Sequence, residues 1–159
     1  IPFSEQELRE ANGTHVLVAV FPLSINDIKG KVDRSLFFSK EDAWYKNEKF
    51  AKKKETVGWH LVRKDIVPNS TSKTYPEQEA LLVENDGVST TQVMVYTIIG
   101  RYLATGERLL YSIYARTSDV ALGGYRVRVG YFDESGLGVG FDWDNLRDSI
   151  IGVAVARKS

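Results

Sequence analysis

The sequence predicts a single α+β domain over residues 1–159, in which an antiparallel sheet of four C-terminal strands packs on helices. Four segments in the last third of the chain alternate apolar with polar residues, which is the period of a strand with one buried face. Upstream, several Ser and Thr residues are followed three positions later by an acid or an amide, a signature of helix starts. The content of 43% apolar and 26% charged residues is typical of one globular domain.

Helices are predicted from capping boxes, in which the N-cap and N3 residues satisfy each other's backbone amides. The paired residues are Ser4 with Glu7, Ser39 with Asp42, Thr74 with Glu77, and Ser89 with Gln92. The second helix is expected to run through Phe50. The fourth, over Ser89–Thr105, is closed by Gly106 and is the expected central packing element.

Strands are predicted at Thr14–Phe21 and Trp59–Val67, and the four C-terminal segments predict a meander with one apolar face. The sequence leaves open whether one or both N-terminal strands join that sheet. The inward-facing residues of the four segments are Leu109, Tyr111, Ile113 and Ala115; Tyr125, Val127, Val129 and Tyr131; Leu137, Val139, Phe141 and Trp143; and Ile151, Val153 and Val155.

The turn at Asp133–Gly136 determines how two of these strands pair. A two-residue loop would pair odd with even positions and mix the two faces, which a half-buried sheet does not tolerate. We therefore predict a three-residue loop with Gly136 in a left-handed conformation. The expected cross-strand pairs are Tyr131 with Val139, Val129 with Phe141, Arg128 with Asp142, and Arg126 with Asp144.

This register predicts which side chains are buried. Arg126 and Arg128 should lie outside the core, where opposite charges across a ladder stabilise by about 0.2–1 kcal/mol per pair. The residues expected to be deeply buried are Val127, Val129, Val139, Phe141 and Val153.

The composition excludes several classes of function. The chain has no cysteine, so it holds no disulfide, thiolate zinc site or cysteine nucleophile. His15 and His60 have no metal-ligand spacing, and no cofactor is predicted. No apolar run approaches the roughly 18 residues of a membrane span, and no signal peptide is visible. We expect a soluble protein, with a cytoplasmic location favoured, and a fragment of a longer polypeptide because the chain opens at Ile1 rather than at methionine.

The best candidate binding surface lies on the polar face of the C-terminal sheet. Arginines and a tyrosine there flank the small residues Gly138 and Gly140, which makes a shallow platform for a planar or anionic ligand. The alternative is that another element covers this platform, with the glycines permitting its close approach. The candidate ligand-binding residues are Tyr114, Arg116, Arg126 and Arg128.

Two alternative functions come from charged clusters. Carboxylates at Asp133, Glu134, Asp142 and Asp144 could hold a divalent cation in a small hydrolase or nuclease, although turn formation and sheet ion pairs also explain them. Separately, the zero net charge hides a basic stretch at Lys46–Lys54, which could contact nucleic acid or stabilise a helix C-terminus.

Segments Trp59–Arg63, Thr105–Leu109, Arg116–Asp119 and Ile151–Lys158 resemble an uncharacterised family of bacterial proteins, over about residues 57–158. The resemblance implies a bacterial or mobile-element origin, and it carries no activity or site. No catalytic motif stands out, so the predicted function is a non-enzymatic binding or interaction module. Its predicted partner is a protein or an anionic ligand.

Overall fold

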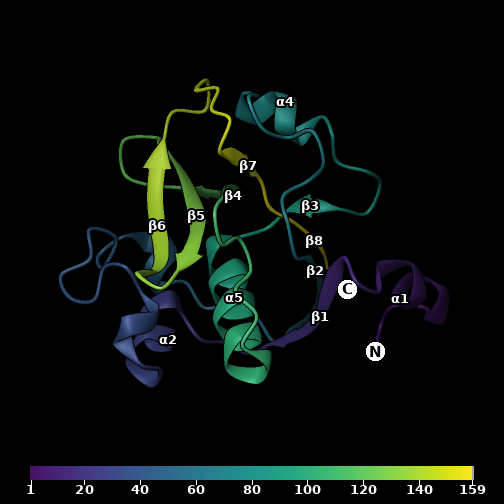
Figure 1. Ribbon diagram of the computed structural model, residues 1–159, viewed down its shortest axis with the longest axis horizontal. Coiled ribbons are helices and arrows are strands. Elements are labelled where there is room, and N and C mark those ends of the chain that lie inside the picture. Colours follow the sequence, from purple (N-terminus) through teal and green to yellow (C-terminus); the bar gives the residue numbers. More distant parts are fainter. Residues whose placement is uncertain (159) are drawn as a thin grey trace.

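Helix α5 (Thr91–Thr105) lies between two four-stranded sheets in the computed structural model, which describes residues 1–158 (Figure 1). This arrangement confirms the predicted α+β fold class. The strands are β1 (His15–Val20), β2 (Gly58–Arg63), β3 (Gly87–Val88), β4 (Tyr114–Val120), β5 (Arg126–Asp133), β6 (Gly136–Asp142), β7 (Ile151–Val153) and β8 (Val155–Lys158). The other helices are α1 (Glu5–Ala11), α2 (Ile25–Lys31), the 3₁₀ turn η1 (Arg34–Leu36), α3 (Lys49–Lys52) and α4 (Tyr75–Glu79).

The strands divide differently from the prediction. The C-terminal sheet has the order β6-β5-β4-β7, and the second sheet has the order β1-β2-β8-β3. The N-terminal strands therefore form a sheet of their own with β3 and β8. The predicted last strand is split at Ala154, whose N–H donates to Arg116 and whose carbonyl accepts from Ser89, both at 3.0 Å. The chain thus crosses there from one sheet to the other.

The meander prediction holds only for β4, β5 and β6. Strand β7 instead pairs in parallel with β4 on the opposite edge. Residues 109–113 form turns rather than the start of a strand, and β4 begins at Tyr114. Within these turns, Leu110 has a positive φ of 54°.

Two of the predicted capping boxes are confirmed, at Ser4 and at Thr74. Helix α5 begins one residue later than predicted, with Thr90 as N-cap, and ends as predicted at Gly106 with a φ of 78°. Helix α2 was not predicted, although Ser24 and Asp27 form a complete capping box.

The predicted helix from Ser39 through Phe50 is wrong. Residues 39–48 form bends and turns, Asp42 has a φ of 45°, and only the four residues of α3 are helical. A long-range contact stabilises this non-helical conformation. The indole Nε1 of Trp44 donates to the carbonyl of Val139 on β6 at 2.9 Å.

The predicted three-residue loop is also wrong. Asp133 pairs directly with Gly136, so the loop has two residues, and a bulge between Gly130 and Asp133 then shifts the register. Tyr131 in this bulge has a φ of 49°. Because of the bulge, odd-numbered residues of β5 pair with odd-numbered residues of β6, so each side chain lies on the predicted face. Each residue of β5 nevertheless pairs with a β6 residue two positions earlier than predicted.

Both predicted ion pairs form, but along diagonals of the ladder. Arg126 lies directly across from Asp142, yet its Nε pairs with Asp144 Oδ1 at 3.0 Å. Arg128 lies across from Gly140, and its Nε pairs with Asp142 Oδ2 at 3.1 Å. Diagonal neighbours on one face lie within reach of long side chains.

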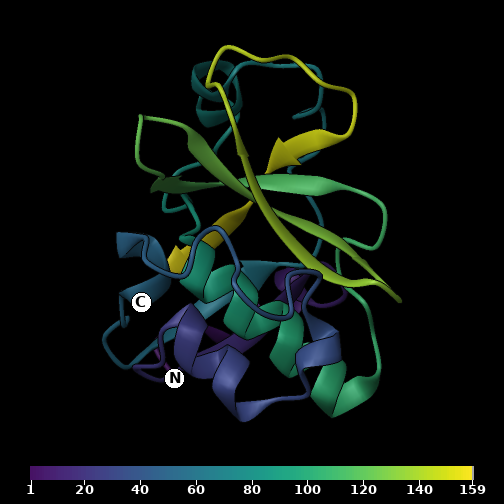
Figure 2. The ribbon, with the colours of Figure 1, turned by 90° about the vertical axis from the view of Figure 1, so that its left-hand side faces the viewer.

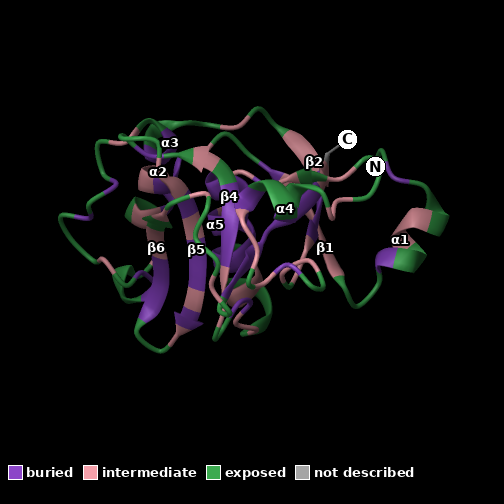
Figure 3. Ribbon diagram, turned by 90° about the horizontal axis from the view of Figure 1, so that it is seen from above, coloured by how far each residue is buried: buried purple, intermediate pink, exposed green. Residues whose placement is uncertain are grey.

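The main core lies where the C-terminal sheet meets α5. Figure 2 shows α2 beside α5, below this sheet, and Figure 3 shows buried residues gathered on β4 and β5 while α1 at the edge is largely exposed. Val127, Val129 and Val153 are fully buried as predicted. Val139 is only half-buried and Phe141 is 43% exposed, so the burial prediction is wrong for these two residues. Within residues 1–158, no helix is long and apolar enough to cross a membrane.

Candidate functional site

Arg116 is fully buried and belongs to the fold rather than to a ligand platform. Its guanidinium donates to side-chain and backbone oxygens at 2.8–3.2 Å: those of Lys73, Gln78, Asp142, Trp143 and Leu146. All five N–H donors of a guanidinium are thereby used. Segments around α4 and after β6 cover this part of the sheet, so the ligand-binding role predicted for Arg116 is corrected to a structural one.

The other three predicted binding residues lie on the same face but are engaged within the protein. Arg126 makes two hydrogen bonds to Asp144 at 3.0 and 3.1 Å, and its guanidinium lies 3.8 Å from the ring centroid of Tyr75. The Arg128 guanidinium lies 4.0 Å from the ring centroid of Tyr114. This face of the sheet, which carries Arg116, Arg126 and Arg128, is called here the arginine face, and these contacts leave little of it for a ligand.

Burial governs the protonation of this face. It raises the pKa of the Tyr75 phenol to about 12, against the smaller opposing effect of Arg126. Burial is the largest single influence on Arg126 and works against its charged form, but the hydrogen bonds that it donates to Asp144, together with the nearby negative charges, raise the pKa of Arg126. Arg126 is therefore charged, and the Asp144 carboxylate offsets its charge.

The carboxylates predicted as metal ligands do not come together. Asp133 is the last residue of β5, at the hairpin turn, and accepts from the backbone N–H of Ser135 at 2.8 Å. Asp142 is the last residue of β6 and Asp144 follows that strand, at the opposite end of the hairpin, and both carboxylates pair with arginines. Among the described residues, no three His, Cys, Asp or Glu side chains gather closely enough to hold a metal ion.

The predicted basic stretch lies on the surface around α3. Lys53 and Lys54 have carboxylate partners at 3.7 and 3.6 Å. Lys46, Lys49 and Lys52 are exposed and form no ion pair within the part of the chain that the structure describes. Their charge is therefore available to an anionic partner.

A row of packed aromatic rings lies beside these lysines, and it is called here the aromatic ladder. Its residues are Trp44, Phe141, Tyr125 and Trp143, with successive ring centroids 4.8, 5.0 and 4.2 Å apart. Trp44, Phe141 and Trp143 are 38%, 43% and 56% exposed. Contiguous exposed apolar patches on a protein surface often mark interaction sites.

Two contacts join the aromatic ladder to the basic segment. The Trp44 ring packs on Phe50 of α3 with centroids 5.8 Å apart. The carboxylate of Glu48 accepts from the backbone N–H of Leu122, in the turn before Tyr125, at 3.2 Å. The ladder is therefore in contact with the segment that carries the three unpaired lysines, and the ladder and these lysines are called below the aromatic–basic surface.

The sequence interpretation missed this surface. It placed Phe141 on the apolar face of the sheet, opposite Val127, which is correct, but it took that face to be covered and extended the strand to Trp143, which lies beyond the end of β6. It also placed Trp44 within a helix. The available signal was the change from aliphatic Val139 to the larger aromatic residues that follow it along one strand.

No family model, curated protein or solved structure matches this chain. The resemblance to a bacterial family stays a prediction. The function proposed below is inferred from the geometry of the chain's own residues.

Proposed function

We propose that the protein is a non-enzymatic binding module whose aromatic–basic surface binds single-stranded nucleic acid. The supporting observation is that four contacting aromatic rings adjoin the segment that carries three lysines without an ion pair among the described residues. Exposed bases stack on aromatic side chains at about 1–3 kcal/mol per base, and cationic side chains track the phosphates. The arginine face offers less, because its charges are already paired.

The chemistry of the surface favours a single strand over a duplex. The bases of a duplex are stacked on one another, so their faces are not accessible to Trp44 or Trp143. A neutral carbohydrate would use the rings but not the lysines, whereas an acidic peptide would use the lysines with little dependence on the rings. The tests that follow distinguish both of these ligands from a single-stranded nucleic acid.

Replacing Trp143 by alanine is expected to weaken binding of a fluorescently labelled single-stranded oligonucleotide about 5- to 150-fold, which corresponds to one lost stacking contact. Trp143 is 56% exposed, so the fold should tolerate this change. Fluorescence anisotropy measures the affinity. The matched control is Tyr111→Ala, because Tyr111 is 47% exposed but lies outside the aromatic ladder. Equal loss in both variants would contradict the proposal.

The lysines should determine the salt dependence of binding. Each phosphate contact to a single strand contributes about 0.7 to the slope of log affinity against log salt. Replacing Lys46, Lys49 and Lys52 together by glutamine should therefore reduce that slope by about 2. Lys31→Gln, an exposed lysine at the end of α2, should leave it unchanged. An unchanged slope in the triple variant would place the nucleic acid elsewhere.

A further inference from the structure

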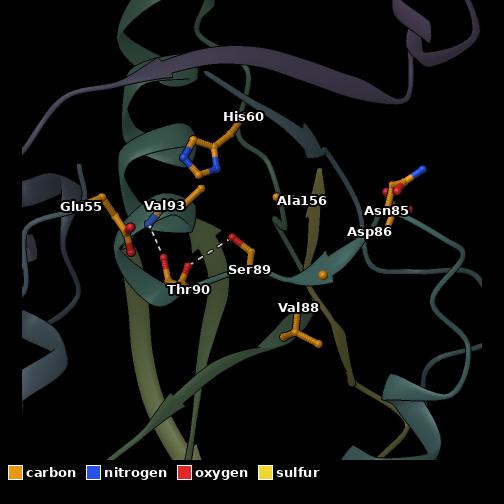
Figure 4. A pocket seen from close by; sticks show the side chains of 10 residues that line it. Glu55, His60, Asn85, Asp86, Val88, Ser89, Thr90, Val93 and Ala156 are labelled. Carbon is orange, nitrogen blue, oxygen red and sulfur yellow. Dashed lines mark hydrogen bonds between the residues drawn. The ribbon is translucent and has the colours of Figure 1, made fainter. Parts of the chain in front are cut away.

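A cavity of about 430 Å³ opens at the N-terminal end of α5, where that helix meets strands of the second sheet (Figure 4). Its apolar walls include Val88, Val93 and Ala156, and the buried polar side chains of His60 and Ser89 also line it. Small-molecule sites are commonly concave, largely apolar cavities of roughly 300–1,000 Å³ with a few placed polar groups. This cavity has that character.

Glu55 brings a carboxylate into the wall of the cavity. Its side chain is only 11% exposed, and the Oε1 atom is buried with no hydrogen-bond partner among the described residues. Lys53 Nζ lies 3.7 Å from Oε1, too far for a hydrogen bond, and the Lys53 side chain is 54% exposed to solvent. Figure 4 shows the carboxylate turned toward the cavity.

The backbone donors at the start of α5 and the second carboxylate of the cavity already have partners. In the first turn of α5, Val93 N–H donates to Thr90 Oγ1 at 3.2 Å and Thr91 N–H donates to Asp119 at 2.7 Å. The helix N-terminus therefore does not depend on Glu55 for capping. Asp86 is likewise paired, with Arg157 at 3.1 Å. The Glu55 carboxylate differs from Asp86 in that its charged partner, Lys53, is solvent-exposed and does not hydrogen-bond to Oε1.

We propose that this cavity, the Glu55 cavity, binds a small organic cation that carries an ammonium group on an apolar body. A buried carboxylate is costly unless it is paired and hydrogen-bonded, and an ammonium group supplies both a charge and N–H donors. The apolar body would pack against Val88, Val93 and Ala156. This site is separate from the aromatic–basic surface and does not depend on nucleic-acid binding.

Titration with benzylammonium, followed by backbone amide NMR, tests the proposal. The amide signals of Gly87, Val88 and Val93 are expected to shift, and neutral benzyl alcohol should bind about tenfold more weakly or worse. Glu55→Gln should weaken benzylammonium binding about 10- to 100-fold while leaving benzyl alcohol binding unchanged. The exposed Glu84→Gln is the matched control, and it should change neither affinity.

The stability of the variant gives a second readout. Glu55→Gln removes a buried charge whose Oε1 atom has no hydrogen-bond partner among the described residues, so its Tm should equal or exceed that of the parent protein. Equal binding of benzylammonium and benzyl alcohol, no shifts at the cavity amides, or unchanged benzylammonium affinity in Glu55→Gln would each overturn the proposal. Oligonucleotide affinity of Glu55→Gln should match that of the parent, so the two proposals succeed or fail separately.

Discussion

Replacing Arg116 by methionine is expected to lower the free energy of unfolding by about 3–5 kcal/mol, the cost of removing one partner of a buried ion pair. Methionine keeps most of the apolar length of the side chain but none of its donors. The change leaves the side-chain oxygen of Gln78 and three backbone carbonyls without the hydrogen bonds that they accept at 2.8–3.1 Å. Urea denaturation measures the loss, which is large beside a typical total of about 5–15 kcal/mol.

The matched control is Arg147→Met. Arg147 pairs with Glu77, but its side chain is 57% exposed, and such surface pairs contribute only about 0–1 kcal/mol. If Arg116→Met cost no more than Arg147→Met, Arg116 would not anchor the segments that cover the arginine face. That result would reopen this face as a ligand site.

Gly130→Ala is expected to destabilise the protein by about 2–5 kcal/mol, from a steric clash together with backbone strain. Gly130 has a φ of 155°, and an added Cβ would lie 2.1 Å from the carbonyl oxygen of Ile113 and 2.9 Å from the Cα of Tyr114. Both contacts are with backbone atoms, so no side chain can move aside. Ile113 also accepts a hydrogen bond from Tyr131 at 3.0 Å, which holds the bulge against the chain entering β4.

Gly100→Ala is expected to have the opposite effect on stability. Gly100 is exposed within α5, and an added Cβ would have no heavy atom within 4 Å. Alanine is favoured over glycine in a helix by about 0.5–1 kcal/mol, so this variant should gain stability by that amount. Thermal unfolding of the two variants side by side distinguishes the effects. Comparable losses in both would show that the bulge does not require the close approach at Gly130.

The sequence predicts helix ends correctly where neighbouring residues alone determine them. The capping boxes at Ser4 and Thr74 and the closing Gly106 depend on residues within one helical turn, and all three predictions are confirmed. The equivalent pattern at Ser39 gave a wrong helix. There the outcome depends on Trp44, which reaches a strand 95 residues away in the chain.

The site was harder to predict for the same reason. The sequence placed Arg116 and Arg128 correctly on one face, as their cross-strand pairing shows. It gave no sign that the residues following Asp142 would fold back over Arg116. Alternation along a strand reports which side chains share a face, but coverage of that face depends on distant segments. For this reason neither the exposure of the aromatic ladder nor the burial of Glu55 could be predicted from the sequence.

The three tryptophan indole N–H signals in an NMR spectrum test the nucleic-acid proposal most directly. Trp44 and Trp143 belong to the aromatic ladder, whereas Trp59 lies on β2 and packs with the small core beneath α1. On titration with a single-stranded oligonucleotide, the indole signals of Trp44 and Trp143 should shift together while that of Trp59 stays in place. A shift confined to Trp59, or no shift at Trp44 and Trp143 under conditions where the oligonucleotide binds, would contradict binding at the aromatic–basic surface.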